Sequence, residues 1–139
     1  MKHIIKKNNY IIEYSINKKL EKNGSYIEKY LDNSIKLQTT YKNDLKHGEY
    51  NSYNGDIIIL TTYFNDELHG NYKEYYQNNL YIDSNYNKGL LHGNYKKYYY
   101  NRIFIDTTYF NNSIHGTYKE YYDNVVLKID INYDSGEII

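Results

Sequence analysis

The chain of 139 residues contains no cysteine, proline, tryptophan or alanine. Without cysteine it can form neither a disulfide nor a thiolate nucleophile, and cysteine-ligated zinc is excluded. The longest aliphatic run covers residues 57–60, far short of the roughly 20 apolar residues of a membrane-spanning helix. The 17 basic and 17 acidic residues give a formal net charge of zero, without the basic tail or face typical of nucleic-acid binders. We therefore expect no transmembrane segment and no nucleic-acid partner.

Tyrosine, asparagine, isoleucine and lysine are abundant instead, with 22 tyrosines and only one arginine. All four residue types have AT-rich codons, which indicates an AT-rich source such as a giant virus, a protist or a low-GC bacterium. The aromatic content of 18% and the regular patterning argue against disorder, and the lack of alanine favours strands over helices. The start, MKHIIKKNNY, does not resemble a secretory signal. We expect an intracellular, cytoplasmic protein, located in the host cytoplasm or the virion if the source is a virus.

Five similar units fill residues 24–139, and residues 1–23 resemble a divergent starting unit that caps the array. Successive units begin 24, 22, 23 and 23 residues apart. Each one starts with Gly-x-Tyr, continues with further aromatic residues and an asparagine, and closes on a second tyrosine. The starting glycines are Gly24, Gly48, Gly70, Gly93 and Gly116; the closing tyrosines are Tyr41, Tyr63, Tyr86, Tyr109 and Tyr133. A fixed period of this length is the signature of a repeat architecture.

Each unit has the pattern of a β-hairpin. The segment that ends at the closing tyrosine alternates with period two, which predicts a strand with one buried face. The side chains predicted to share that face, unit by unit, are Ile35, Leu37, Thr39 and Tyr41; Ile57, Ile59, Thr61 and Tyr63; Leu80, Ile82, Ser84 and Tyr86; Ile103, Ile105, Thr107 and Tyr109; and Leu127, Ile129, Ile131 and Tyr133. The shorter Gly-x-Tyr segment is the other strand, and its glycine is expected to begin it.

Two tight turns per unit connect these strands. One carries the repeated asparagine, and Asn54-Gly55 is the dipeptide that favours positive φ at both central positions of a hairpin turn. The other lies three residues after the closing tyrosine, where every copy has a residue type that tolerates the left-handed conformation: Asp44, Asp66, Gly89, Asn112 and Gly136. We predict an all-β fold, an elongated, twisted, single-layer antiparallel β-meander of about a dozen strands.

The unit Tyr-x-Asn-(Gly/Asp/Asn)-x-Leu-His-Gly-x-Tyr-x-x-Tyr resembles MORN repeats, especially the variant of bacterial antitoxin-like MORN proteins. It departs from the usual pattern where the hairpin-tip glycine is lost in four of five copies, and where the second glycine is often Asp or Asn. The resemblance covers residues 24–139 and implies a binding or scaffolding module without catalytic residues or a cofactor. Some members of the family have been linked to membranes or phosphoinositides.

The repeated His-Gly pair is open to three interpretations: a ladder of metal ligands, a set of catalytic bases, or a structural turn. Equivalent histidines should lie two strands apart, roughly 9–10 Å, whereas two nitrogens on one zinc ion lie within about 4 Å. No nucleophile recurs beside them, as a catalytic base would require. We favour the structural turn, with no metal and no catalytic residue, for His47 and Gly48, His69 and Gly70, His92 and Gly93, and His115 and Gly116.

Two rows of side chains are candidate binding residues. Tyrosine offers rigid area with a hydrogen-bonding tip, so the row Tyr53, Tyr75, Tyr98 and Tyr121 is either a binding strip or packing between units. A parallel row of Lys73, Lys96 and Lys119 is either a solvated face compensated by Glu74 and Glu120 or a site for anionic lipid headgroups.

No carboxylate pair, nucleophile constellation or phosphate loop stands out from the repeat, so we predict a protein that is not an enzyme. The expected function is protein binding or scaffolding, with a homodimer that covers an aromatic face as one form of partner. The alternatives are an antitoxin-like inhibitor of a partner enzyme and a binder of glycans or anionic lipid headgroups.

Overall fold

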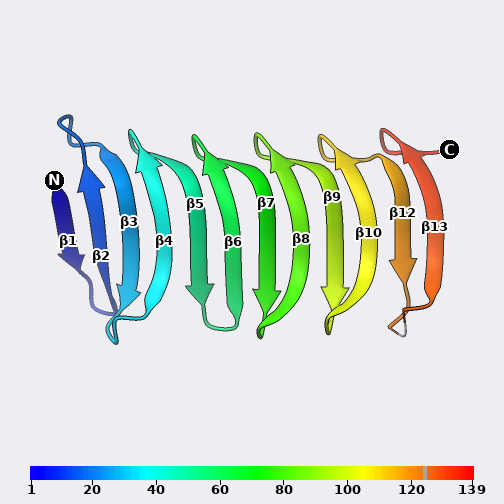
Figure 1. Cartoon of the computed structure of the whole chain (residues 1–139), viewed down its shortest axis with the longest axis horizontal. Coiled ribbons are helices and arrows are strands. Elements are labelled where there is room, and N and C mark those ends of the chain that lie inside the picture. The colour runs from blue at the N-terminus through cyan, green and yellow to red at the C-terminus, as the bar shows by residue number, and fades with distance from the viewer. Residues whose placement is uncertain (124) are drawn as a thin grey trace.

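The computed structural model describes residues 1–123 and 125–139, and these form one open antiparallel sheet of 14 strands (Figure 1). The strands are β1 (Lys2–Lys6), β2 (Tyr10–Ile16), β3 (Lys22–Tyr30), β4 (Ile35–Lys42), β5 (Leu45–Asn54), β6 (Ile57–Phe64), β7 (Glu67–Tyr76), β8 (Asn79–Asn87), β9 (Leu90–Tyr99), β10 (Arg102–Phe110), β11 (Ser113–Ile114), β12 (Gly116–Tyr121), β13 (Leu127–Asp134) and β14 (Glu137–Ile138). Each pairs with its neighbour in sequence, except that β12 pairs with β10 and the short β11 pairs only with β10. The predicted single-layer β-meander is confirmed.

Figure 1 shows the strands side by side in one elongated row, with the two termini at opposite ends. The five units correspond to the hairpins β3–β4, β5–β6, β7–β8, β9–β10 and β12–β13, and residues 1–23 add the hairpin β1–β2. The described residues include no helix long and apolar enough to cross a membrane.

The two faces of the sheet carry different side chains. Residues opposite each other in an antiparallel pair point to the same face. Tyr72 on β7 lies opposite Thr61 on β6 and Ser84 on β8, and this pairing defines the tyrosine face. The ladder face, on the other side, carries Lys73 opposite Asp83.

Small hydroxyl residues form the core on the tyrosine face. They are Thr39, Thr61, Ser84 and Thr107, which are 2%, 7%, 0% and 2% exposed. Beside them, the first and closing tyrosines of each unit contact each other, with ring centroids 5.2–6.3 Å apart in Tyr26–Tyr41, Tyr50–Tyr63, Tyr72–Tyr86, Tyr95–Tyr109 and Tyr118–Tyr133. Each such ring pair contributes about 0.5–1.5 kcal/mol beyond the area it buries. Since the sheet has no second layer, these rings themselves cover the core.

The turns between units have the predicted backbone. The residue three positions after each closing tyrosine has a positive φ of 65–93°, and the residue before it has a φ of 50–52°. Positive φ at both central positions is the type I′ geometry that matches the twist of paired strands. Each turn also bonds to the turn of the preceding unit: the N–H of Asp66 donates to the carbonyl of Lys46, and the Asp66 carboxylate accepts from the N–H of Lys46. The predicted left-handed positions are confirmed.

The turn at the tip of β5–β6 differs from the prediction. Asn54 pairs with Ile57, so Gly55 and Asp56 are the central residues, and Gly55 alone of these has a positive φ, +58°. In three other units the repeated asparagine does take positive φ: Asn33, Asn78 and Asn101. The fifth, Asn124, lies outside the described residues.

A second correction concerns the alternating strands. In four of the five hairpins the register shifts by one residue near the tip, as a β-bulge does. The first residue of the predicted row therefore points to the ladder face, as Leu80 does opposite Tyr75. The extra residue points to the tyrosine face instead. Only β5–β6 lacks the bulge, and there Ile57 keeps the predicted face. The displaced residues are Ile35, Leu80, Ile103 and Leu127.

Candidate functional site

The most distinctive surface is an aromatic groove on the tyrosine face, near the tips of β7–β8 and β9–β10. It consists of two adjoining hollows with volumes of about 370 and 450 Å³. Tyr81, Tyr98 and Tyr99 line both hollows, so the two form one continuous feature. Tyr76 and Tyr100 complete the first hollow, and Phe104 and Tyr122 complete the second. We call these seven aromatic residues and the space between them the aromatic groove.

The walls of the groove are unusually exposed for such large side chains. Tyr76, Tyr99, Tyr100 and Tyr122 are 52%, 59%, 74% and 52% exposed. A contiguous exposed apolar surface with polar groups at its rim is typical of an interaction site. Tyr99 and Tyr100 also contact each other edge to face, with ring centroids 4.6 Å apart. The groove therefore offers large, hydrogen-bonding aromatic surfaces to solvent.

The bulges place two of these seven residues. Tyr81 and Phe104 are the extra residues of the bulged strands β8 and β10, so they join the tyrosine face out of the alternating pattern. The equivalent residues of the first and last units are Lys36 and Lys128, and neither contributes an aromatic ring. The groove is therefore confined to the third and fourth units and the adjoining edge of the fifth.

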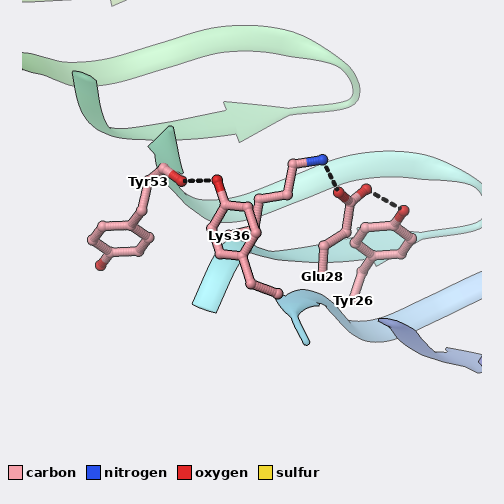
Figure 2. Close-up of polar contacts among 5 residues, drawn as sticks. Tyr26, Glu28, Lys36 and Tyr53 are labelled. Atoms are coloured by element: carbon pink, nitrogen blue, oxygen red, sulfur yellow. Dashed lines mark hydrogen bonds and ion pairs between the residues drawn. The ribbon is translucent and has the colours of Figure 1, made fainter. Parts of the chain in front are cut away.

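The charged residues of the groove also set the fourth unit apart. Three units place a glutamate two residues after the first tyrosine, and the tyrosine hydroxyl donates to it, as Tyr72 does to Glu74 over 2.8 Å. Figure 2 shows the same contact between Tyr26 and Glu28, to which Lys36 also donates, over 3.1 Å. The fourth unit has Lys97 at this position, and its ammonium group lies 5.1 Å from the centre of the Tyr81 ring.

Burial raises the pKa values of eight first and closing tyrosines, namely Tyr26, Tyr41, Tyr63, Tyr72, Tyr86, Tyr95, Tyr109 and Tyr118. Burial, followed by the hydrogen bond to the Glu74 carboxylate, raises the pKa of Tyr72 well above its ordinary value of 10. Burial also raises the pKa of Tyr95, which has Lys97 instead of a glutamate at the equivalent position. These hydroxyls therefore stay protonated at neutral pH, and those of Tyr26, Tyr72 and Tyr118 donate to glutamates.

The register places the predicted tyrosine row on the ladder face, although one member of the row, Tyr98, also lines both hollows of the groove. Tyr75 is opposite Ile58 and Leu80, and Tyr98 is opposite Ile103, all on the ladder face. Tyr75, Tyr98 and Tyr121 are half-buried, whereas Tyr53 is 36% exposed. The more exposed tyrosines in three of these units are the next residues along the chain, Tyr76, Tyr99 and Tyr122.

The predicted lysine row also lies on the ladder face, where aspartates compensate its charge. Lys96 is opposite both Asp83 and Asp106 in the register, and the Lys96–Asp106 distance is 3.6 Å. Lys73 lies 3.8 Å from Asp83, and Lys119 lies 3.9 Å from Asp130. These residues form a ladder of alternating charge across β7 to β13. Glu74 and Glu120, expected to compensate the lysines, point to the tyrosine face instead.

The histidines lie at the edge formed by the inter-unit turns. The Nδ1 atom of His47 lies 3.2 Å from the side-chain oxygen of Asn65, and that of His92 lies 3.1 Å from Asn111. His115 lies 3.3 Å from the carboxylate of Asp134. His69 contacts the Phe64 ring, with centroids 6.0 Å apart. Within the described part of the chain, no three His, Cys, Asp or Glu residues are placed to hold a metal ion.

Three of the glycines beside them, Gly48, Gly70 and Gly93, lie inside strands, where the register with the preceding strand shifts. Gly48, Gly70, Gly93 and Gly116 have φ between +89° and +105°. A Cβ on Gly48 would lie 2.5 Å from the hydroxyl of Thr40, which donates to the carbonyl of His47. We expected the glycine of each unit to begin its strand, and this holds only for Gly116. Strands β5, β7 and β9 each begin three residues before their glycine, and β3 begins two residues before Gly24.

Of the seven aromatic residues that line the groove, the sequence pattern selected only Tyr98. Tyr76, Tyr99 and Tyr122 directly follow the predicted row, and the bulges that place Tyr81 and Phe104 break the alternation from which faces were assigned. A usable signal was the length of the unit between its starting glycine and closing tyrosine: relative to the second unit, the third and fourth are one residue longer and the first and fifth are two residues longer.

No protein-family model matches the sequence, and no curated protein matches it. Fold and site together define the class: an open, single-layer array of β-hairpins with an aromatic groove on one face.

Proposed function

We propose that the protein is a non-enzymatic binding module that holds an extended segment of a partner protein in the aromatic groove. The observation that carries this proposal is the set of tyrosines left more than half exposed around two adjoining hollows. Aromatic side chains, tyrosine above all, dominate protein-binding surfaces because they offer large area at low conformational cost. The resemblance of the units to MORN repeats supports the same class of function, that of a binding or scaffolding module.

The spacing of the hollows favours an extended partner segment that crosses the strands. Tyr76 and Tyr81 in one hollow correspond to Tyr99 and Phe104 in the next, one hairpin away. Two strand spacings amount to about 9–10 Å. An extended polyproline II segment rises about 3.1 Å per residue, so side chains three positions apart are separated by about 9 Å. One such segment would place apolar side chains i and i+3 in the two hollows.

The charges of the groove favour a segment with both polar and apolar groups. Glu74 and Asp123 lie at its rim together with Lys97 and Arg102. Arg102 already donates to the carbonyl of Asp123 over 2.9 Å. Lys97 forms no ion pair among the described residues and is therefore the cation available to an acidic side chain or a backbone carbonyl of the partner.

The proposal is tested by selecting random 12-residue peptides displayed on phage against the purified protein. The selected peptides should carry large apolar side chains at positions i and i+3. Their affinity should fall at least about tenfold for Tyr76→Ser/Tyr99→Ser, since buried aromatic contacts in binding sites are each worth more than about 1 kcal/mol.

The matched control is Tyr53→Ser/Tyr75→Ser, which changes two tyrosines of the ladder face that line neither hollow. Its affinity for the same peptides should stay within about threefold of the wild type, with folding verified by circular dichroism. Peptides that bind the first double variant as well as the wild type would contradict the proposal, as would selected peptides without the i, i+3 pattern.

A further inference from the structure

We propose that copies of this chain associate end to end, with β13 of one copy pairing with β1 of the next to continue the sheet. This association goes beyond the groove and uses the two edges of the sheet instead. The partner is therefore a second copy of the same chain, bound through backbone hydrogen bonds and complementary charges.

Both edge strands present unpaired backbone. Among the described residues, β1 pairs only with β2. On the outer side of β13, β14 pairs only with Tyr133 and Asp134, and the N–H of Ile139 donates to the carbonyl of Asn132. Residues 127–131 thus have no strand on that side in the described structure. An edge of this kind is a template for another strand.

The strand directions suit a continued meander. Neighbours alternate in direction from β1 through β10, β12 and β13, and each pair is antiparallel. Figure 1 shows β1 and β13 at the two ends of the row, pointing in opposite directions. A copy translated along the row would therefore place its β1 antiparallel to β13, the relation found between units within the chain.

The charges of the two edges are complementary. Residues 1–9 contain three lysines and no acidic residue, whereas residues 123–139 contain four acidic residues and one lysine. On the ladder face, Asp106 lies in register between Lys96 and Lys119. Asp130 has Lys119 on its inner side and no neighbour on its outer side in the described structure. The ladder thus ends on an aspartate at the edge where a lysine would come next.

Lys2 is placed to continue the ladder. It lies on the ladder face of β1, where its ammonium group is 2.6 Å from the carboxylate of Glu13. A register that leaves β14 in place puts Lys2 opposite Asp130. The same register brings Ile4 close to Leu127, also on the ladder face, and these side chains are 60% and 46% exposed. Association would then bury apolar side chains and complete one more rung of the ladder.

Lysines on an edge strand also occur as protection against unwanted pairing. Lysines protect an edge only when the facing edge does not attract them, whereas here the facing edge is acidic.

An end-to-end interface of this kind is heterologous, so it forms open chains rather than a closed dimer. Light scattering of the wild-type protein should show a mass that rises with concentration through multiples of the 16.8 kDa chain and falls in high salt. A mass of one chain at every concentration up to about 1 mM would overturn the proposal.

Cysteine cross-linking tests the register, because the chain has no cysteine of its own. In Lys2→Cys/Asp130→Cys the two thiols lie at opposite ends of one molecule, so a disulfide can form only between copies. Opposed residues in paired strands meet the Cα separation of a disulfide. Mild oxidation should give a ladder of multimers on a non-reducing gel. The control Ile5→Cys/Asp130→Cys places one thiol on the tyrosine face and should give at least tenfold less cross-linked multimer. Equal cross-linking of both variants would overturn the proposed register.

Reversing the charges of the two sheet edges distinguishes specific edge-to-edge pairing from nonspecific association. Lys6→Glu/Lys7→Glu makes both ends acidic, and Asp123→Lys/Asp130→Lys makes both ends basic. Each variant alone should be monomeric, and an equimolar mixture should associate again. The control Lys42→Glu/Lys88→Glu carries the same net charge as the first variant but changes turns away from the edges, and it should associate like the wild type. Association of either end variant alone would contradict the proposal. Peptide binding in the groove should be unchanged in all of these charge variants. A failure of the end-to-end association can therefore be distinguished from a failure of the proposed function.

Discussion

The residues at the centre of each strand are small because tyrosine rings lie beside them. Ser84 is fully buried between Tyr72 and Tyr95, which lie opposite it on the two neighbouring strands. A sheet with one layer has no other element to supply a core, so the aromatic side chains must lie across their own strands. The alternation of large and small residues along each strand therefore follows from the absence of a second layer.

The glycine of each His-Gly pair is tested by two matched substitutions. Gly48 and Gly93 have nearly the same φ, +105° and +99°. Alanine at either position should cost about 1–3 kcal/mol of unfolding free energy, because non-glycine residues are strained there. Gly48→Ala should lose about 1–3 kcal/mol more, since its Cβ would lie 2.5 Å from the Thr40 hydroxyl, whereas the nearest atom to Gly93 is 3.5 Å away.

Urea unfolding followed by circular dichroism measures both losses. Adding Thr40→Ala to Gly48→Ala should recover most of the difference, because it removes the hydroxyl that clashes. Equal losses for the two alanine variants, with no effect of the second substitution, would show that the close approach to Thr40 does not constrain this position.

Strands and inter-unit turns follow from local chemistry, which is why the sequence predicts them. The strands have a periodic pattern, and each turn has Asn, Asp, Gly, Lys or Ser at its two left-handed positions. The bulges do not follow in this way. Whether Tyr81 adds to β8 as an extra residue depends on how the strand pairs with β7, and a single strand's pattern carries no information about register. The position of the groove was therefore not predictable from alternation alone.

The first hairpin is attached through a carboxylate that responds to acid. Lys2 and Lys29 lie 2.6 and 2.8 Å from Glu13, and their hydrogen bonds lower the pKa of Glu13 from 4.5 to about 2. A carboxylate with a lowered pKa stabilises the folded state above its unfolded pKa, and this contribution is lost as the pH falls through the folded value. Amide exchange in β1 should accelerate relative to β8 as the pH falls from about 4.5 to about 2.

The control for this prediction is Glu13→Gln, which removes the charge. In this variant β1 should exchange faster than in the wild type at pH 6, and the ratio of exchange in β1 to that in β8 should change little over the acid range. A wild-type β1 whose relative exchange does not change between pH 6 and pH 2 would contradict the role given to Glu13.

On the scale of the whole molecule, the chain is a one-dimensional array in which each hairpin pairs only with its neighbours. In such an array, stability is close to a sum over units and their interfaces. Deletion of residues 71–93 removes one period and joins Gly70 to Asn94, which follows the equivalent glycine. The shortened protein should fold with an unchanged strand spectrum and unfold at a lower urea concentration.

The deletion should also remove peptide binding, because it takes away Tyr76 and Tyr81 and with them the first hollow. Removal of residues 71–82, which is about half a period and joins Gly70 to Asp83 within β8, provides an out-of-phase comparison that should not fold into the continuous sheet. A shortened protein that fails to fold after the in-phase deletion would contradict the description of the chain as an additive array.

The central claim is that the tyrosine face, not the ladder face, is the binding surface. Hydroxyl-radical footprinting with mass spectrometry compares the wild-type protein free and bound to a selected peptide. We predict that the peptide protects Tyr76, Tyr99 and Tyr122 and leaves Tyr53 as reactive as in the free protein. Protection of Tyr53, Tyr75 and Tyr121, with no change at the groove, would contradict the claim.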